Sequence, residues 1–174
     1  MENRIERIKA KLIQRLQKYL DDEVIDEIRL EPLPIEKIVM FENEHHIKLP
    51  EGIVDFYTKI SNGVKLYPDE DICNLEPFEN WSYSPKLIQK DFDIENDVTY
   101  DDYCAIKSQN GDYSFESFGN IALMDLGCAM SYCIVVKGKH YGEMIVVREM
   151  YLEIKNKSFL DWIEDSLDGT EELL

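Results

Sequence analysis

The histidines are the first residues to test for chemistry. Glu42 and His46 lie four residues apart with His45 beside them, so one helix face could present two metal ligands. The sequence has no H-E-x-x-H motif, and a third ligand would have to come from elsewhere in the chain. We therefore favour a solvated helix end, and we expect no metal and no other cofactor.

A nucleophile and a base could come from the cysteines and the third histidine. Cys128 or Cys133 could act as a nucleophilic thiol, with His140 as its general base. Both cysteines lie in or beside an apolar run, where a thiol is more often an inert hydrophobic side chain. Ser131 has no G-x-S-x-G elbow around it, and no glycine-rich phosphate loop is present. We expect no catalytic residue and no enzymatic activity.

Acidic and aromatic residues are interleaved from residue 67 to residue 103. This stretch has eleven acids and two lysines, a net charge of −9. A disordered acidic linker would contain few aromatics, so we expect folded loops, with a short strand at Asp71–Leu75 and a short helix near Pro85–Lys90. Aromatics are also typical of interface cores, and a charged rim steers an encounter. A buried aromatic core under a solvated acidic face would explain the same composition.

If the stretch binds a partner, its acids and aromatics are the candidate contacts. Carboxylates can imitate the phosphates that a basic nuclease site holds, because Arg and Lys donate charge-assisted hydrogen bonds to both. The predicted partner is therefore a basic protein. The predicted contact residues are Asp69, Glu70, Asp71, Trp81, Tyr83, Asp97, Tyr100, Asp101 and Asp102.

The charge of the whole chain favours the same class of partner. The 174 residues include 36 acids and 19 bases, which gives a net charge of −17. Residues 1–20 differ, because their six bases and two acids give +4. Most of the surface would repel nucleic acid and attract a basic protein. Simple solubility is the competing explanation for the acidity.

Length and hydropathy predict one cytoplasmic domain. A chain of 174 residues that is 44% hydrophobic can bury one ordinary core. No apolar run approaches the roughly 20 residues that span a bilayer, and the charged N-terminus lacks the apolar centre of a secretory signal. The four cysteines contain no C-x-x-C pair and fit reduced, buried thiols. No membrane contact is expected.

Three short apolar runs predict the centre of a sheet. The runs are Ile121–Leu126, Tyr132–Val136 and Met144–Val147, and glycine-containing turns separate them. Short runs rich in β-branched and aromatic residues, joined by tight turns, are typical of antiparallel strands.

Apolar residues at three- and four-residue steps predict helices around this sheet. An amphipathic helix with a basic outer face is expected over residues 3–20, and a second helix over residues 35–46. A third should run from Pro50 to Asn62-Gly63, and Ser158 should cap a closing helix that Gly169 ends. We predict an α+β fold: a mostly antiparallel sheet, helices largely on one side, and a C-terminal helix.

The order of motifs resembles the SUKH superfamily of SMI/KNR-type proteins. An F-E step, L-P, an aromatic pair and N-G correspond here to Phe41, Glu42, Leu49, Pro50, Phe56, Tyr57, Asn62 and Gly63. The resemblance continues through Gly119-Asn120-Ile121 and the closing helix, and so covers residues 34–167 after an extension of residues 1–30. Residues 126–131 depart from it, because members often have a glycine-rich turn with an Asp there.

The resemblance implies an α+β domain that binds another protein. Many bacterial members are immunity proteins that neutralise a cognate polymorphic toxin, often a nuclease, and stoichiometric immunity is our leading hypothesis. The alternative is a non-enzymatic regulatory or scaffolding module with a cellular protein client, as other members are. An unrecognised hydrolase would need a cleft with converging carboxylates or His46. A homo-oligomer could form through an exposed sheet edge or the first helix.

Overall fold

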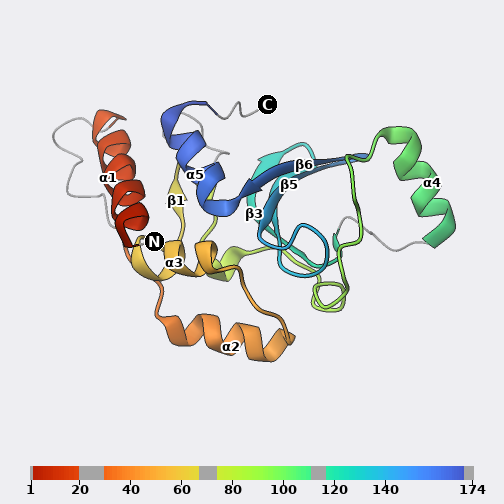
Figure 1. Ribbon diagram of the computed structural model, residues 1–174, viewed down its shortest axis with the longest axis horizontal. Helices are drawn as coiled ribbons and strands as arrows, with labels where there is room; N and C mark the ends of the chain where they lie inside the picture. Colours follow the sequence, from red (N-terminus) through yellow and green to blue (C-terminus); the bar gives the residue numbers. More distant parts are fainter. Residues whose placement is uncertain (1, 20–29, 67–73, 111–116, 171–174) are drawn as a thin grey trace.

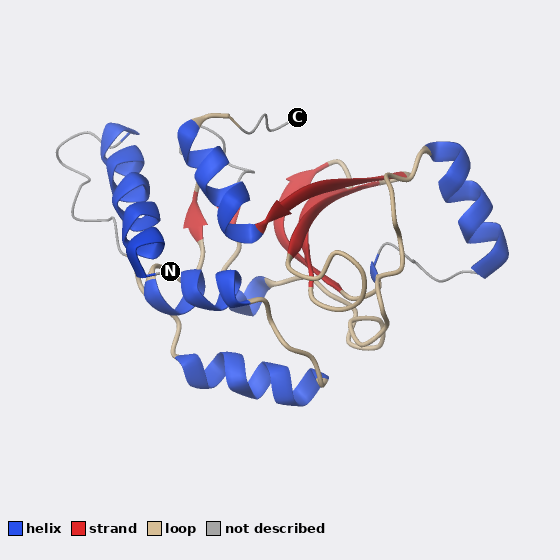
Figure 2. Ribbon diagram, viewed as in Figure 1, coloured by secondary structure: helices blue, strands red, loops and turns tan. Residues whose placement is uncertain are grey.

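A four-stranded antiparallel sheet forms the centre of the fold (Figures 1 and 2). The computed structural model describes residues 2–19, 30–66, 74–110 and 117–170. The strands of the sheet lie side by side in chain order: β3 (Asn120–Gly127), β4 (Met130–Val135), β5 (Glu143–Arg148) and β6 (Tyr151–Ser158). The first three are the predicted apolar runs. The α+β class is confirmed.

The fourth strand, β6, was missed in the sequence. Charged and polar residues alternate in it with only two buried apolar side chains, Leu152 and Ile154. Pairing with β5 sets Ile154 opposite Ile145 and Leu152 opposite Val147. The hydrophobic support for β6 thus comes from its neighbour and not from its own sequence.

Alternate side chains of the sheet enter two separate cores. On one face, Ile121, Ile134 and Met144 are paired across three strands and belong to the larger core. The helices whose apolar side chains join that core are α1 (Glu2–Tyr19), α2 (Ile35–His45), α3 (Glu51–Lys59) and α5 (Phe159–Asp168). These helices gather on one side of the fold, as predicted, whereas α4 (Tyr100–Asn110) lies apart from them (Figure 1).

The smaller core covers the opposite face of the sheet. Cys133, Ile145 and Ile154 form a row across β4, β5 and β6 on that face. The acidic segment before α4 covers them with Phe92 and Val98, both at most 3% exposed. The predicted folded loops therefore hold part of the core, and their aromatic and aliphatic residues alternate with the solvated acids.

The N-terminal helix lies against α5 and binds it through both apolar and charged side chains. Ile5, Ile8, Leu12 and Leu16 of α1 are buried in the larger core. The pairs that link the charged faces are Arg4–Asp161 at 2.6 Å, Arg4–Glu164 at 2.9 Å, Arg7–Glu164 at 2.7 Å and Lys11–Asp168 at 2.7 Å. The helix is confirmed, but its predicted basic outer face is corrected: these cations lie against the acids of α5.

Segments outside the sheet partly cover both of its edges. Along β3, Ala122 exchanges hydrogen bonds with Ser82, and the Glu76 amide donates to the Leu123 carbonyl at 2.8 Å. Along β6, Leu152 exchanges hydrogen bonds with Val98 at 2.8 and 3.0 Å. An edge whose backbone groups are already paired is a poor template for another chain.

Three local expectations are corrected. The expected helix near Pro85–Lys90 is a series of turns. The expected strand at Asp71–Leu75 is reduced to β2 (Asn74–Leu75), which pairs with β1 (Val64–Lys65), and residues 71–73 lie outside the described residues. The third helix ends at Lys59, so Gly63 is not its cap. Gly63 has a φ of 83°, and a Cβ there would lie 2.7 Å from the Pro77 nitrogen.

Both ends of the closing helix are formed as predicted. The Ser158 side chain accepts a hydrogen bond from the Asp161 amide, and Gly169 ends α5 in a left-handed conformation. Ser158 and Asp161 are the first and fourth residues of the expected capping pattern. No helix in the described part of the chain is long and apolar enough to span a membrane.

Acid should weaken the contact between α1 and α5. Hydrogen bonds from Arg7, together with the charges of Arg4 and Arg7, hold the pKa of Glu164 below its usual range. A lowered folded-state pKa stabilises the fold above the unfolded value of about 4.3, and this stabilisation is lost as pH falls through the folded value. Glu164→Gln should therefore cost about 1 kcal/mol at pH 7 in urea unfolding, and much less at pH 3.5.

Glu149→Gln is the matched control, because Glu149 is exposed in the turn between β5 and β6. Its effect should stay within about 0.5 kcal/mol at both pH values. A Glu164→Gln penalty that does not change with pH would contradict this assignment.

The turn between β3 and β4 should become more stable when its residues suit its backbone. Cys128 and Ala129 have φ values of 50° and 58°, and two-residue hairpin turns with positive φ at both positions favour Asn-Gly. Cys128→Asn/Ala129→Gly should therefore raise the free energy of unfolding by about 1 kcal/mol. Ala105→Gly, inside α4, should lower it by about 0.5–1 kcal/mol. Urea titration measures both changes in the free energy of unfolding. A change of the same sign in the two variants would contradict backbone strain in this turn.

Candidate functional site

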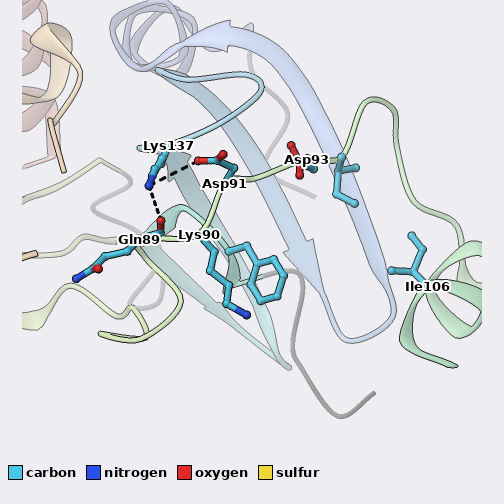
Figure 3. A pocket seen from close by; sticks show the side chains of 8 residues that line it. Gln89, Lys90, Asp91, Asp93, Ile106 and Lys137 are labelled. Atoms are coloured by element: carbon cyan, nitrogen blue, oxygen red, sulfur yellow. Dashed lines mark hydrogen bonds and ion pairs between the residues drawn. The ribbon is translucent and has the colours of Figure 1, made fainter. Parts of the chain in front are cut away.

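A groove lies between the segment of residues 89–98 and α4. It consists of two adjoining hollows of about 490 and 480 Å³, which share Asp93, Ile94 and Ile106. Figure 3 shows the first hollow, with Ile106 extending from α4 across from the segment that carries Asp93. Ile94, Ile106 and Phe118 give the groove an apolar floor, and they pack against the smaller core. The groove could therefore accept an apolar side chain of a partner.

Carboxylates form most of the rim of this groove, together with the lysines Lys90, Lys137 and Lys139. Lys90 Nζ lies 4.8 Å from the centroid of the Phe118 ring. Residues 91–102 contain six acids and no base. Lys137 lies 3.7 Å from Asp91 and donates to the Gln89 carbonyl at 2.6 Å (Figure 3). Lys139 pairs with Glu95 at 2.7 Å and holds the pKa of that carboxyl below its usual value. Asp93 and Asp101 are exposed and make no ion pair within the described residues. The rim thus keeps carboxylates that are free to meet cations.

Two of the predicted contact residues also build the groove. The Asp97 carboxylate accepts a hydrogen bond from the Ile154 amide at 2.8 Å, which fixes the segment to β6. Asp102 accepts from the Thr99 hydroxyl at 2.6 Å, and its own amide donates back to that hydroxyl at 3.4 Å. This reciprocal pair caps the start of α4 and lowers the pKa of Asp102. Thr99 and Asp102 form a capping box, the signal that could have revealed α4 in the sequence.

The predicted contact residues do not lie on one surface. Asp97, Tyr100, Asp101 and Asp102 lie at or beside the groove, and Tyr100 is 59% exposed. Trp81 and Tyr83 lie against α2 instead. Asp69, Glu70 and Asp71 lie outside the described residues.

The two aromatics beside α2 are held by hydrogen bonds. The Trp81 indole is 6% exposed and donates to the Tyr57 hydroxyl at 3.0 Å. The Tyr83 hydroxyl lies 3.1 Å from His45 Nε2. Trp81 thus belongs to the core, and Tyr83 is half-buried above it.

The sequence did not single out Asp93, Glu95 and the apolar floor of the groove. The signal was the alternation of acid and apolar residues in Asp91-Phe92-Asp93-Ile94-Glu95. Such a period of two is typical of an extended segment with one buried face. Phe92 is fully buried and exchanges hydrogen bonds with Lys137 and Lys139, which fixes this orientation.

Among the described residues, neither Cys128 nor Cys133 forms a catalytic pair with His140. Cys128 lies before β4 and His140 lies after it, so the length of a strand of roughly 20 Å separates them. Cys133 is buried in the smaller core, where burial raises the pKa of its thiol to about 12. His140 Nδ1 lies 2.8 Å from a carboxylate oxygen of Glu143. These positions give neither Cys128 nor Cys133 an adjacent His140 side chain that could act as its base.

The side chains considered above as a two-ligand metal site, those of Glu42, His45 and His46, are held by other contacts within the protein. Glu42 is 8% exposed, and its carboxylate accepts from the Leu49 amide at 2.9 Å and from Lys48 Nζ at 2.6 Å. His45 is bound to Tyr83, and His46 has a φ of 52° and ends α2 as its cap. Among the described residues, no three metal-ligating side chains cluster.

Glu42 and Leu49 belong to a set of motif residues that hold the connections between helices. The Tyr57 hydroxyl donates to the Glu76 carbonyl at 2.7 Å, and burial raises the pKa of this hydroxyl. The Asn62 side chain accepts from the Phe78 amide at 2.8 Å and donates to Glu79 at 3.0 Å. These contacts tie the second and third helices to each other and to the segment after β2.

Residues 32–165 match the model of the SMI1 / KNR4 family (SUKH-1). The match covers about three quarters of the chain and includes both the groove and the helical motif residues. It begins after α1. No curated protein and no solved structure matches the chain.

Loss of the Glu42 carboxylate should destabilise the fold, because the buried Leu49 amide would lose its acceptor. Glu42→Ala should cost about 2 kcal/mol in urea unfolding, and Glu42→Gln should cost less because its side-chain carbonyl can still accept. Glu44→Ala is the matched control on the exposed face of the same helix and should cost under about 0.5 kcal/mol. Equal losses at positions 42 and 44 would contradict this role.

Proposed function

The chain belongs to the SMI1 / KNR4 family (SUKH-1), and we propose from this premise that it is an immunity protein. It would bind a cognate toxin in the cytoplasm at one-to-one stoichiometry and block the toxin's active site or a neighbouring surface. The toxin would be a basic protein, such as a nuclease. The family is known from toxin–immunity systems, and the acidic groove supplies a surface suited to such a partner.

The observation that carries the proposal is the unbalanced charge of the groove. Five carboxylates line the groove, Asp91, Asp93, Glu95, Asp97 and Asp102, against the three lysines Lys90, Lys137 and Lys139. Among the described residues, only Asp91 and Glu95 are paired with lysines. A concentrated negative potential raises the association rate of a cationic partner by about 10- to 1,000-fold. The net charge of −17 extends this field over the rest of the surface.

The apolar floor of the groove would contribute binding affinity that exposed charges alone do not provide. Exposed ion pairs contribute only about 0–1 kcal/mol each, so the carboxylates would mainly steer and orient the toxin. An apolar side chain seated on Ile94, Ile106 and Phe118 would provide a desolvated centre, as in protein interfaces where a few buried contacts dominate affinity. The acids around it would then occupy the cationic groups with which a nuclease binds phosphate.

Capture from lysate of the source organism tests the proposal. The immobilised chain should retain one basic protein at near-equal stoichiometry after washes at low and then moderate salt. Expression of that protein alone should arrest growth, and co-expression of the chain should restore it. Retention of an acidic or neutral protein without toxicity would instead favour a regulatory or scaffolding role.

The toxin should lose affinity when the unpaired rim carboxylates are reversed. Asp93→Lys/Asp101→Lys should slow association at least about tenfold, because it reverses the field at the groove without removing a backbone contact. Glu6→Lys/Glu31→Lys is the control, since it changes the net charge equally at exposed positions outside the groove. Surface plasmon resonance at two salt concentrations measures both. Equal effects of the two variants would exclude the groove as the binding site.

A further inference from the structure

Helix α2 exposes large apolar side chains outside the acidic groove. Met40 is 70% exposed, and Ile35 and Val39 are each 46% exposed. Among the described residues, Tyr100, Tyr141 and Met150 are the only other large hydrophobic side chains with comparable exposure. Half of this set thus lies on one helix of eleven residues. Such a concentration is typical of a surface that a partner covers.

An aromatic hollow of about 370 Å³ lies directly beside Met40. Phe41, Phe78, Trp81 and Tyr83 line it, and their rings meet edge to face or tilted, with centroids 4.8–6.0 Å apart. Thioether sulfur makes favourable contacts with aromatic rings, and methionine adapts its shape to irregular gaps. The same surface therefore carries an exposed methionine and a hollow suited to receive one.

The charges around the hollow are also self-complementary. Lys37 and Glu44 line it seven residues apart on α2, on either side of Met40, and both are exposed and make no ion pair within the described part of the chain. Glu79 lines the hollow from the segment after β2, and a hydrogen bond from Asn62 together with the charge of Lys37 holds its pKa below the usual value. If two copies of α2 packed antiparallel about an axis near Met40, Lys37 of each copy would lie opposite the partner's Glu44. A parallel arrangement would place like charges together.

Other routes to self-association are already occupied. Both edges of the sheet carry backbone hydrogen bonds to Ser82 or Val98. On α1, the cations Arg4, Arg7 and Lys11 are paired with the acids of α5. Neither of the two elements from which a homo-oligomer was expected therefore offers the self-complementary surface that α2 offers.

We propose that the chain forms a twofold-symmetric dimer through α2. In this dimer, Met40 of each copy enters the aromatic hollow of the other, and two Lys37–Glu44 pairs flank the axis. A patch that carries both a knob and its hole is what an isologous interface requires, because each copy presents the same surface. The inference does not depend on the immunity function, since α2 and α4 lie at different ends of the fold (Figure 1).

Sedimentation velocity of the full chain over a range of concentrations tests the dimer. The wild type should show a concentration-dependent dimer, and Met40→Lys should weaken it at least about tenfold by placing a charge in the hollow. Met150→Lys is the matched control, because Met150 is exposed in the turn between β5 and β6. It should leave the dimer unchanged. A monomer at all concentrations, or a dimer that survives Met40→Lys, would overturn the proposal.

Charge exchange tests the antiparallel pairing itself. Lys37→Glu and Glu44→Lys should each weaken the dimer, and the double variant should restore it because both pairs re-form with exchanged signs. A double variant weaker than either single variant would exclude the pairing. If the wild type is monomeric and Met40→Lys abolishes toxin binding, then this face belongs to the toxin and the dimer is wrong. If groove variants lose toxin binding but still form the dimer, this result would support both the groove as the toxin site and α2 as the dimer interface.

Discussion

Burial of the central sheet on both faces is the constraint on which the rest of the structure depends. Helices cover one face, and the other must be covered by a segment that is mostly acidic. Phe92 and Val98 supply that cover, and their inward orientation turns the neighbouring acids toward solvent. The acidic rim is thus a by-product of core formation, and it is also the surface that we propose for a partner.

The motif residues on which the resemblance to the family was based stabilise the scaffold and do not form the candidate site. Glu42 satisfies the Leu49 amide, Tyr57 binds the Glu76 carbonyl, and Asn62 binds the Phe78 amide. Each is a polar group that compensates backbone atoms where a connection leaves a helix or strand. Family membership therefore predicts the framework, whereas the acids and apolar residues that a partner would meet lie elsewhere on it.

The two surfaces proposed for binding have different physical characters. The groove beside α4 combines an apolar floor with unpaired carboxylates, which suits a cationic partner and fast association. The α2 surface combines exposed aliphatic side chains with one lysine and one glutamate, which suits a copy of itself. A dimer through α2 would leave both grooves open, so that one assembly could hold two toxin molecules. The cationic extension α1, neutralised by α5, is available to neither surface.

The sequence by itself determined the strands β3 to β5, the helices α1, α2, α3 and α5, and the acidic character of the surface. Periodicity, glycine turns and the Ser158 cap act within a few residues, so they can be recognised locally. Helix α4 has a local signal in the Thr99–Asp102 capping box, which went unrecognised in the sequence, whereas strand β6 and the groove were decided by tertiary structure. Leu152 is buried because β5 lies beside it, and Ile94 and Ile106 line one groove because Asp97 fixes the segment to β6. Contacts between residues far apart in the chain leave no local period, which is why only the fold could place them.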